Sequence, residues 1–226
     1  MNSDSFCIVG ASNAKIMAIY LNVKFLKLKN LGKEEVDKFV KLENHRSKFP
    51  RTVLLFPPTN TLIPGNRFFD MNGKLHTHQT FNMKRPNSRE IEYVLIELTR
   101  IISILESEGF NIRLMCNFPR AYKNVCDCPS HIFHHAHRQM RLFKVFERSA
   151  KNLVPMCGLT LEFSRFVCNI LNIQQPKVFT DRVVVSIYSK ILQFDNLHLN
   201  NLGKKIVASY LKERLRLPIS DDKCLN

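Results

Sequence analysis

Short apolar runs alternate with longer amphipathic stretches along most of the chain. Short apolar runs at 6–9, 52–56 and 112–116 are followed by Gly, Pro or Asn, which is typical of buried strands. A further strand is predicted at 25–31, where Leu26 and Leu28 alternate with Phe25, Lys27 and Lys29 before Gly32. The stretches that follow carry apolar residues at helical spacing, and they lie at 13–22, 33–43 and 88–108. Strands that alternate with helices in this way predict an α/β fold with a parallel sheet covered on both faces.

The remaining segments complete this pattern. We expect helices at 130–153, 164–172 and 199–215 and a strand-like run at 154–161, whereas 59–88 lacks periodicity and predicts a long loop. A length of 226 residues suits one generous domain. The sequence therefore predicts a single domain over 1–217, with a loop insertion at about 59–88 and a C-terminal tail at 218–226.

Charge is the unusual feature of the composition. The chain has 34 Lys and Arg against 19 Asp and Glu, a net charge of +15, which attracts acidic substrates or polyanions such as RNA. Apolar residues make up 45% of the chain, so composition excludes an intrinsically disordered protein. Oligomeric state is not predicted.

The sequence also bears on compartment. No apolar stretch is long enough to span a membrane, and the polar N-terminus does not have the pattern of a signal peptide. Seven cysteines at scattered positions suit reduced thiols better than a disulfide framework. We therefore expect an intracellular protein, in cytoplasm or nucleus.

Candidate chemistry follows the predicted strands, because ligands of open parallel sheets bind at the carboxyl ends of the strands. Ser12 lies in the turn after the first strand, where a serine serves either as a nucleophile or as a helix N-cap. Gly32 follows the second strand and Asn60 the third, so both offer N–H donors at the same edge. Before the last helix, Asp195 precedes His198 by three residues, a spacing that lets the carboxylate orient the imidazole as a base.

Together these signals resemble the SGNH/GDSL hydrolases, and the resemblance spans nearly the whole sequence. It implies a three-layer α/β/α sandwich, flavodoxin-like, with a mostly parallel sheet of about five strands. It also implies an esterase that acts on an ester, thioester or acetyl group without cofactor or metal. Ser12 matches the nucleophile and Asp195 with His198 the base pair, while the oxyanion hole is matched by Ser12, Gly32 and Asn60.

The sequence departs from the pattern of this family at two positions. Ala11 stands where the family has an Asp before the serine, and Pro58 stands where the family usually has a Gly two residues before the Asn. Ala11 is outside the catalytic triad, whereas Pro58 stiffens the loop that carries Asn60. The second departure bears on catalytic rate, because it affects where an oxyanion donor lies.

Two other features compete for a functional role. The segment 126–137 holds two cysteines and four histidines, ligand types suited to zinc, but Cys126 and Cys128 lack the spacing of a structural zinc site, which favours a helix start. The predicted helix beyond it carries a cationic stripe formed by Arg138, Arg141, Lys144, Arg148 and Lys151. This stripe supports an alternative function: a catalytically inactive SGNH-like module that binds RNA or another nucleic acid, as in OSK-type or retroelement-associated domains.

Overall fold

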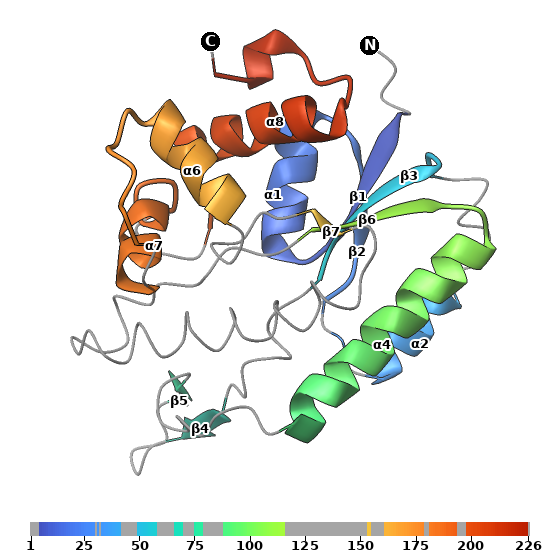
Figure 1. Cartoon of the computed structure of the whole chain (residues 1–226). Coiled ribbons are helices and arrows are strands. Elements are labelled where there is room, and N and C mark those ends of the chain that lie inside the picture. The colour runs from blue at the N-terminus through green and yellow to red at the C-terminus, as the bar shows by residue number, and fades with distance from the viewer. Residues whose placement is uncertain are drawn as a thin grey trace.

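A parallel sheet forms the centre of the molecule (Figure 1). The computed structural model describes residues 5–29, 31, 33–41, 49–57, 66–69, 75–78, 88–115, 153–154, 161–178, 181–193 and 198–225. The sheet has the strand order β2-β1-β3-β6-β7, and every neighbouring pair is parallel. Its strands are β1 (Phe6–Gly10), β2 (Lys24–Lys27), β3 (Thr52–Phe56), β6 (Asn111–Met115) and β7 (Leu153–Val154).

The strand order fixes where a ligand site forms. From β1 the chain moves outward to β2, then returns across β1 to β3 and continues to β6 on the other side. Connections that leave β1 and β3 in opposite directions open a crevice at the carboxyl ends of these two strands. This switch point lies next to Gly10 and Phe56, which are paired in the register of β1 and β3.

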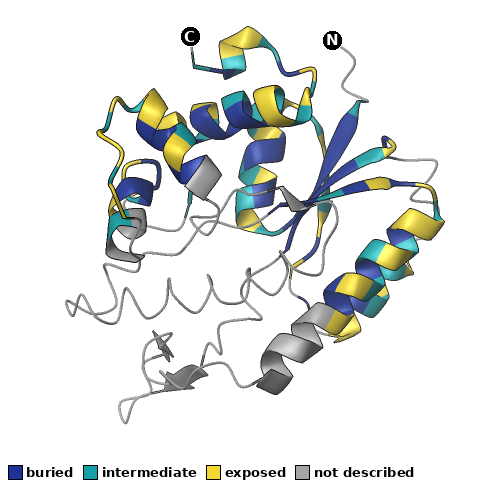
Figure 2. Ribbon diagram, viewed as in Figure 1, coloured by how far each residue is buried: buried dark blue, intermediate teal, exposed yellow. Residues whose placement is uncertain are grey.

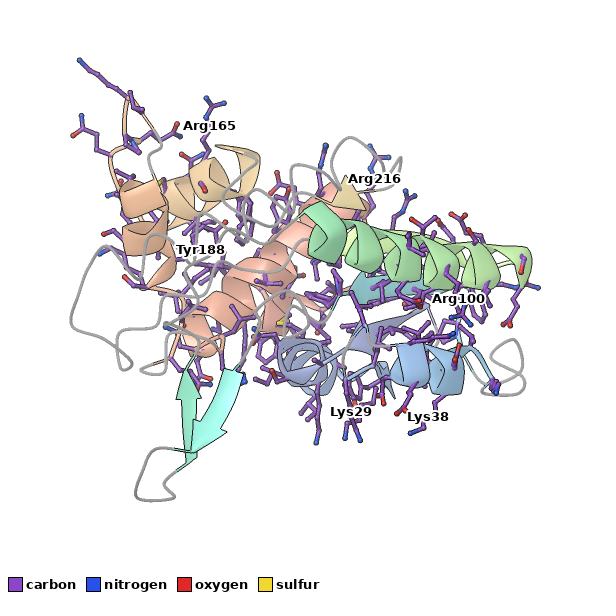
Figure 3. The ribbon with its side chains drawn as sticks, turned by 90° about the horizontal axis from the view of Figure 1, so that it is seen from below. Lys29, Lys38, Arg100, Arg165, Tyr188 and Arg216 are labelled. Carbon is purple, nitrogen blue, oxygen red and sulfur yellow. The ribbon has the colours of Figure 1, made fainter. Side chains whose placement is uncertain are left out.

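Helices cover both faces of the sheet (Figure 1). One face packs against α1 (Ser12–Leu21), α6 (Leu161–Ile170), α7 (Asp181–Tyr188) and α8 (Asn201–Leu215). The other packs against α2 (Lys33–Val40) and α4 (Ser88–Ser107). Arg100 of α4 forms an ion pair with Asp37 of α2, which joins these two helices (Figure 3).

The two apolar clusters explain why β1 and most of β3 are continuously apolar. Ile8 and Leu54 point into the cluster under α1 and α8, whereas Val9 and Leu55 point into the cluster under α2 and α4. Side chains of a strand alternate between faces, so a strand buried on both sides has no polar position. All five residues of β1 are accordingly buried (Figure 2).

The fold class predicted from the sequence is confirmed: the described chain is a three-layer α/β/α sandwich on a parallel sheet. The sequence was wrong about part of the 59–88 segment, which contains two antiparallel strands, β4 (Asn66–Phe69) and β5 (Leu75–His78). Their mixed polar sequences do not alternate strictly between apolar and polar residues, so periodicity does not reveal them. The helix α7 was also missed, and β2 is shorter than the apolar run 25–31.

The C-terminal residues pack against the helical layer. Ile219 and Cys224 are buried, with the 3-10 helix η2 (Asp221–Lys223) between them. The Tyr20 hydroxyl donates to the Lys223 carbonyl at 2.8 Å, and the Leu225 N–H donates to the Ser209 hydroxyl at 2.9 Å. The expected tail therefore contributes to the core on the α1 and α8 side, while the single-domain boundaries stay a prediction.

The structure bears in part on two further predictions, the reduced cysteines and the absence of a membrane-spanning helix. Cys7, Cys168 and Cys224 are buried free thiols, as expected for reduced cysteines, and burial raises the pKa of Cys7 to about 12. Among the described residues, no helix combines the length and the apolar character that crossing a bilayer requires.

Candidate active site

Ser12 lies at the carboxyl end of β1, beside the switch point of the sheet, and is the first residue of α1. The turn that carries it depends on Gly10, whose φ is +151°. A Cβ at this position would lie 2.5 Å from the Phe56 carbonyl oxygen and 2.7 Å from Ala14 Cβ. Glycine therefore lets β1 end in close contact with both β3 and α1, which fixes the backbone leading to Ser12.

The helix-cap interpretation of Ser12 is wrong. Ala11 occupies the N-cap position of α1, and no side chain caps the helix there. The first hydrogen bond of the helix runs from the Lys15 N–H to the Ala11 carbonyl at 2.9 Å, so the Ser12 N–H precedes the helical ladder. Ser12 is exposed, and among the described residues no hydrogen-bond partner is found for its hydroxyl or its N–H, which lie at the positive end of the α1 dipole.

His198 reaches the same place from the other end of the chain. The next residue, Leu199, donates its backbone N–H to Oδ1 of Asn13 at 3.4 Å. Asn13 directly follows Ser12, so this hydrogen bond joins the two candidate catalytic segments across 186 positions of sequence. His198 is half-buried, and the hydrogen bond of its neighbour Leu199 places this segment beside the first turn of α1.

The backbone around His198 is held by Asn200. Its Oδ1 caps α8 by accepting from the Gly203 N–H at 2.7 Å, and its Nδ2 donates to the carbonyls of Lys190 and Leu192, both at 2.9 Å. The Gln193 N–H donates to the His198 carbonyl at 2.6 Å. These contacts tie the residues before and after His198 to one turn at the end of α7.

Gly203 lets α8 approach this turn. A Cβ at Gly203 would lie 2.1 Å from the Ile191 carbonyl oxygen, closer than any packed carbon atom. Leu199 is fully buried and pairs with Leu192 in an antiparallel bridge. Leu199, Asn200 and Gly203 follow His198 closely in the sequence, and their contacts hold the backbone on which His198 lies.

The other predicted site residues lie outside the described part of the chain. These are Asp195, Gly32 and Asn60 of the hydrolase prediction, together with Pro58, the 126–137 segment and the cationic stripe Arg138, Arg141, Lys144, Arg148 and Lys151. Neighbouring described residues place the end of β2 close to the site: the Leu28 N–H donates to the Gly10 carbonyl at 2.8 Å. Within the described ranges, no three His, Cys, Asp or Glu side chains gather into a metal site.

Sequence reasoning missed Asn13 as a residue of the site. Its side chain links the two candidate catalytic segments, but it does so through a contact between residues far apart in the chain. No spacing in the sequence signals such a contact. An asparagine in the first turn of a helix is also common for purely local reasons.

Comparison with known proteins agrees with the fold. No protein-family model matches the sequence, and no curated protein matches it. Among solved structures, the chain is similar to the crystal structure of an acetyl xylan esterase, with 14% identity over 92% of this chain and 98% of that chain and a TM-score of 0.51. At this identity the likeness concerns the fold alone, and it shows that the chain has a hydrolase-like α/β fold.

Proposed function

We propose that the protein is a serine hydrolase of SGNH type that cleaves an ester or acetyl group through an acyl-Ser12 intermediate. The observation that carries this proposal is the hydrogen bond from the Leu199 N–H to Asn13, because it holds His198 beside the segment of Ser12. The exposed Ser12 hydroxyl at the switch point and the hydrolase-like fold support it further.

In this mechanism His198 takes the proton of the Ser12 hydroxyl as the oxygen attacks the carbonyl carbon of the ester. The C–O bond to the leaving alcohol then breaks, and His198 returns the proton to the alcohol oxygen. Water, deprotonated by His198, then attacks the acyl carbon; the bond from this carbon to Ser12 Oγ breaks, His198 returns the proton to Oγ, and the acid is released. Asp195 is proposed to orient the imidazole.

Negative charge develops on the carbonyl oxygen in the tetrahedral intermediate. The Ser12 N–H lies ahead of the helical ladder at the positive end of α1, where it is suited to donate to that oxygen. Gly32 and Asn60 are the proposed second and third donors. Loss of one such donor costs about 100- to 1000-fold in rate in comparable sites.

The test is hydrolysis of 4-nitrophenyl acetate by the wild type and by Ser12→Ala, His198→Ala and the double variant. We expect each single substitution to lower kcat by at least about 1000-fold and the double variant to be no worse, because the two groups act as a unit. Ser107→Ala is the matched control, since Ser107 is an exposed serine at the end of α4, next to the amino ends of β3 and β6. A Ser12→Ala rate equal to the wild type would refute the proposal.

The alternative of nucleic-acid binding stays a prediction. The five residues of its cationic stripe lie outside the described residues, and no contact in the described chain bears on them.

A further inference from the structure

The two chain segments that form the candidate site are free of acidic residues, apart from the proposed Asp195. From Ser5 to Lys33, which includes β1, α1 and β2, the sequence holds five lysines and no Asp or Glu. From His198 to Lys212 it holds three lysines and again no Asp or Glu. A protein surface ordinarily mixes both signs of charge, so the ionisable surroundings of Ser12 on these segments are cationic.

Lys27 stands at the carboxyl edge on the same face as Ser12. It pairs with Gly10 in the parallel register, which places the two Cα atoms about 4.8 Å apart. Phe25, two residues earlier, packs in the cluster under α1, so alternation along β2 directs Lys27 to the α1 face. Lys27 is exposed, and it lies at the carboxyl end of β2, one strand away from the switch point between β1 and β3.

Lys15 approaches Ser12 from the helix. Residues three apart in a helix have their Cβ atoms about 5–6 Å from each other, so Lys15 lies beside Ser12 on the surface of α1. It too is exposed. Within the described residues, no ion pair with a carboxylate is found for Lys15 or Lys27.

Resistance to edge-to-edge pairing explains lysines on β2, which is the edge strand of the sheet. It does not explain Lys15, which lies on α1, nor the lack of acidic residues over both segments. The amino end of α1 adds its positive dipole to the two ammonium groups, and its first turn has no acidic residue to offset them. Three sources of positive potential therefore converge beside Ser12.

We propose that Lys15 and Lys27 bind an anionic group of the substrate, so that the preferred substrate is an ester that carries a negative charge close to the scissile bond. The inference rests on the proposed hydrolase function and names its substrate class. Two flexible ammonium groups hold such an anion by charge, without the planar geometry that an Arg pair would impose.

The test compares a neutral ester, 4-nitrophenyl acetate, with an anionic one, mono(4-nitrophenyl) succinate, in 20 mM salt. The readout is the ratio of kcat/KM for the anionic ester to that for the neutral one. We expect Lys15→Gln and Lys27→Gln each to lower this ratio by up to about 5-fold, and the double variant by about 10-fold or more, mainly through KM. Raising the salt to 0.5 M should lower the wild-type ratio in the same direction.

Lys38→Gln is the control, because Lys38 is an exposed lysine of α2 on the other face of the sheet (Figure 3). An unchanged ratio in the double variant, or an equal fall in Lys38→Gln, would overturn the inference while Ser12-dependent cleavage of the neutral ester persists. If neither ester is cleaved in a Ser12-dependent manner, the hydrolase proposal itself is wrong and this inference falls with it.

Discussion

Asn200 offers the sharpest test of how the site is built, because one amide side chain makes three hydrogen bonds there. Asn200→Ala removes the N-cap of α8, which costs about 1 kcal/mol, and the bond to the Leu192 carbonyl, which costs about 1 kcal/mol more. The exposed bond to the Lys190 carbonyl adds less than about 1 kcal/mol. We expect a total loss of about 2–3 kcal/mol in the free energy of unfolding, or about 4–12 °C in Tm.

Two further variants separate these contributions. Asn200→Ser keeps an oxygen that can cap α8 but has no second donor, so it should recover about 1 kcal/mol relative to Asn200→Ala. Asn201→Ala is the matched control. Asn201 is exposed, and among the described residues its side chain accepts a hydrogen bond from Lys204 alone, so the change should stay within about 0.5 kcal/mol.

Urea unfolding followed by far-UV circular dichroism measures these differences, and esterase activity provides a second readout. Because Asn200 holds the backbone next to His198, we expect Asn200→Ala to lower kcat by about 10- to 100-fold, as a displacement near 1 Å does in other sites. Equal stability of the wild type, Asn200→Ala and Asn200→Ser would show that the three hydrogen bonds do not hold this turn, and the reasoning would be refuted.

Three more predictions follow from particular contacts. Gly10→Ala should cost at least about 2 kcal/mol, measured by urea unfolding, because its Cβ would meet the Phe56 carbonyl at a φ that only glycine adopts readily; unchanged stability would contradict this. The pKa of Cys7 is raised from 9.0 to about 12, so its thiolate form is about 1000-fold scarcer than that of an ordinary cysteine. Peptide mass spectrometry should therefore find Cys7 alkylated far more slowly in the native than in the urea-unfolded protein. Equal alkylation rates in the two states would show that the pKa of Cys7 is not raised by the fold. Hydrogen bonding to Arg100 lowers the pKa of Asp37, so the ion pair stabilises the fold above the ordinary pKa of 3.8, and this stabilisation is lost as the pH falls through the lowered pKa. The difference in Tm between the wild type and Asp37→Asn should therefore shrink below pH 3.8. A difference that grows there would show that the ion pair with Arg100 does not lower the pKa of Asp37.

The sequence predicts those parts of the fold that repeat a simple period. The strand 52–56 coincides with β3, and the helices predicted from 13, 33 and 88 match α1, α2 and α4 to within a few residues, because each buries a continuous apolar side. The sequences of β4 and β5, NRFF and LHTH, show no such apolar period, and α7 is short enough for its pattern to pass unnoticed.

Some residues of the candidate site could likewise be predicted from the sequence, whereas others could not. Ser12 and His198 are predicted from the sequence because few residue types serve as a nucleophile or a base, whereas the cap made by Asn200 and the close approach at Gly203 become visible only in the structure. The role of Asn13 likewise depends on a tertiary contact with Leu199. The choice between cap and nucleophile at Ser12 depends on a one-residue offset in the start of α1, which sequence patterns do not resolve.

The distribution of charge decides how the net +15 should be interpreted. A polyanion-binding surface requires only that cations outnumber acids somewhere on the exterior, whereas here a run of 29 residues around Ser12 carries five lysines and no acid. Two of them, Lys15 and Lys27, are placed by helix spacing and strand register beside the candidate nucleophile. Selection for solubility or for diffuse binding to nucleic acid does not require acids to be absent from the two chain segments that form the candidate site. The proposed anionic ester does favour their absence, because carboxylates on the surface beside Ser12 would repel it, whereas Asp195 is proposed to face the imidazole of His198.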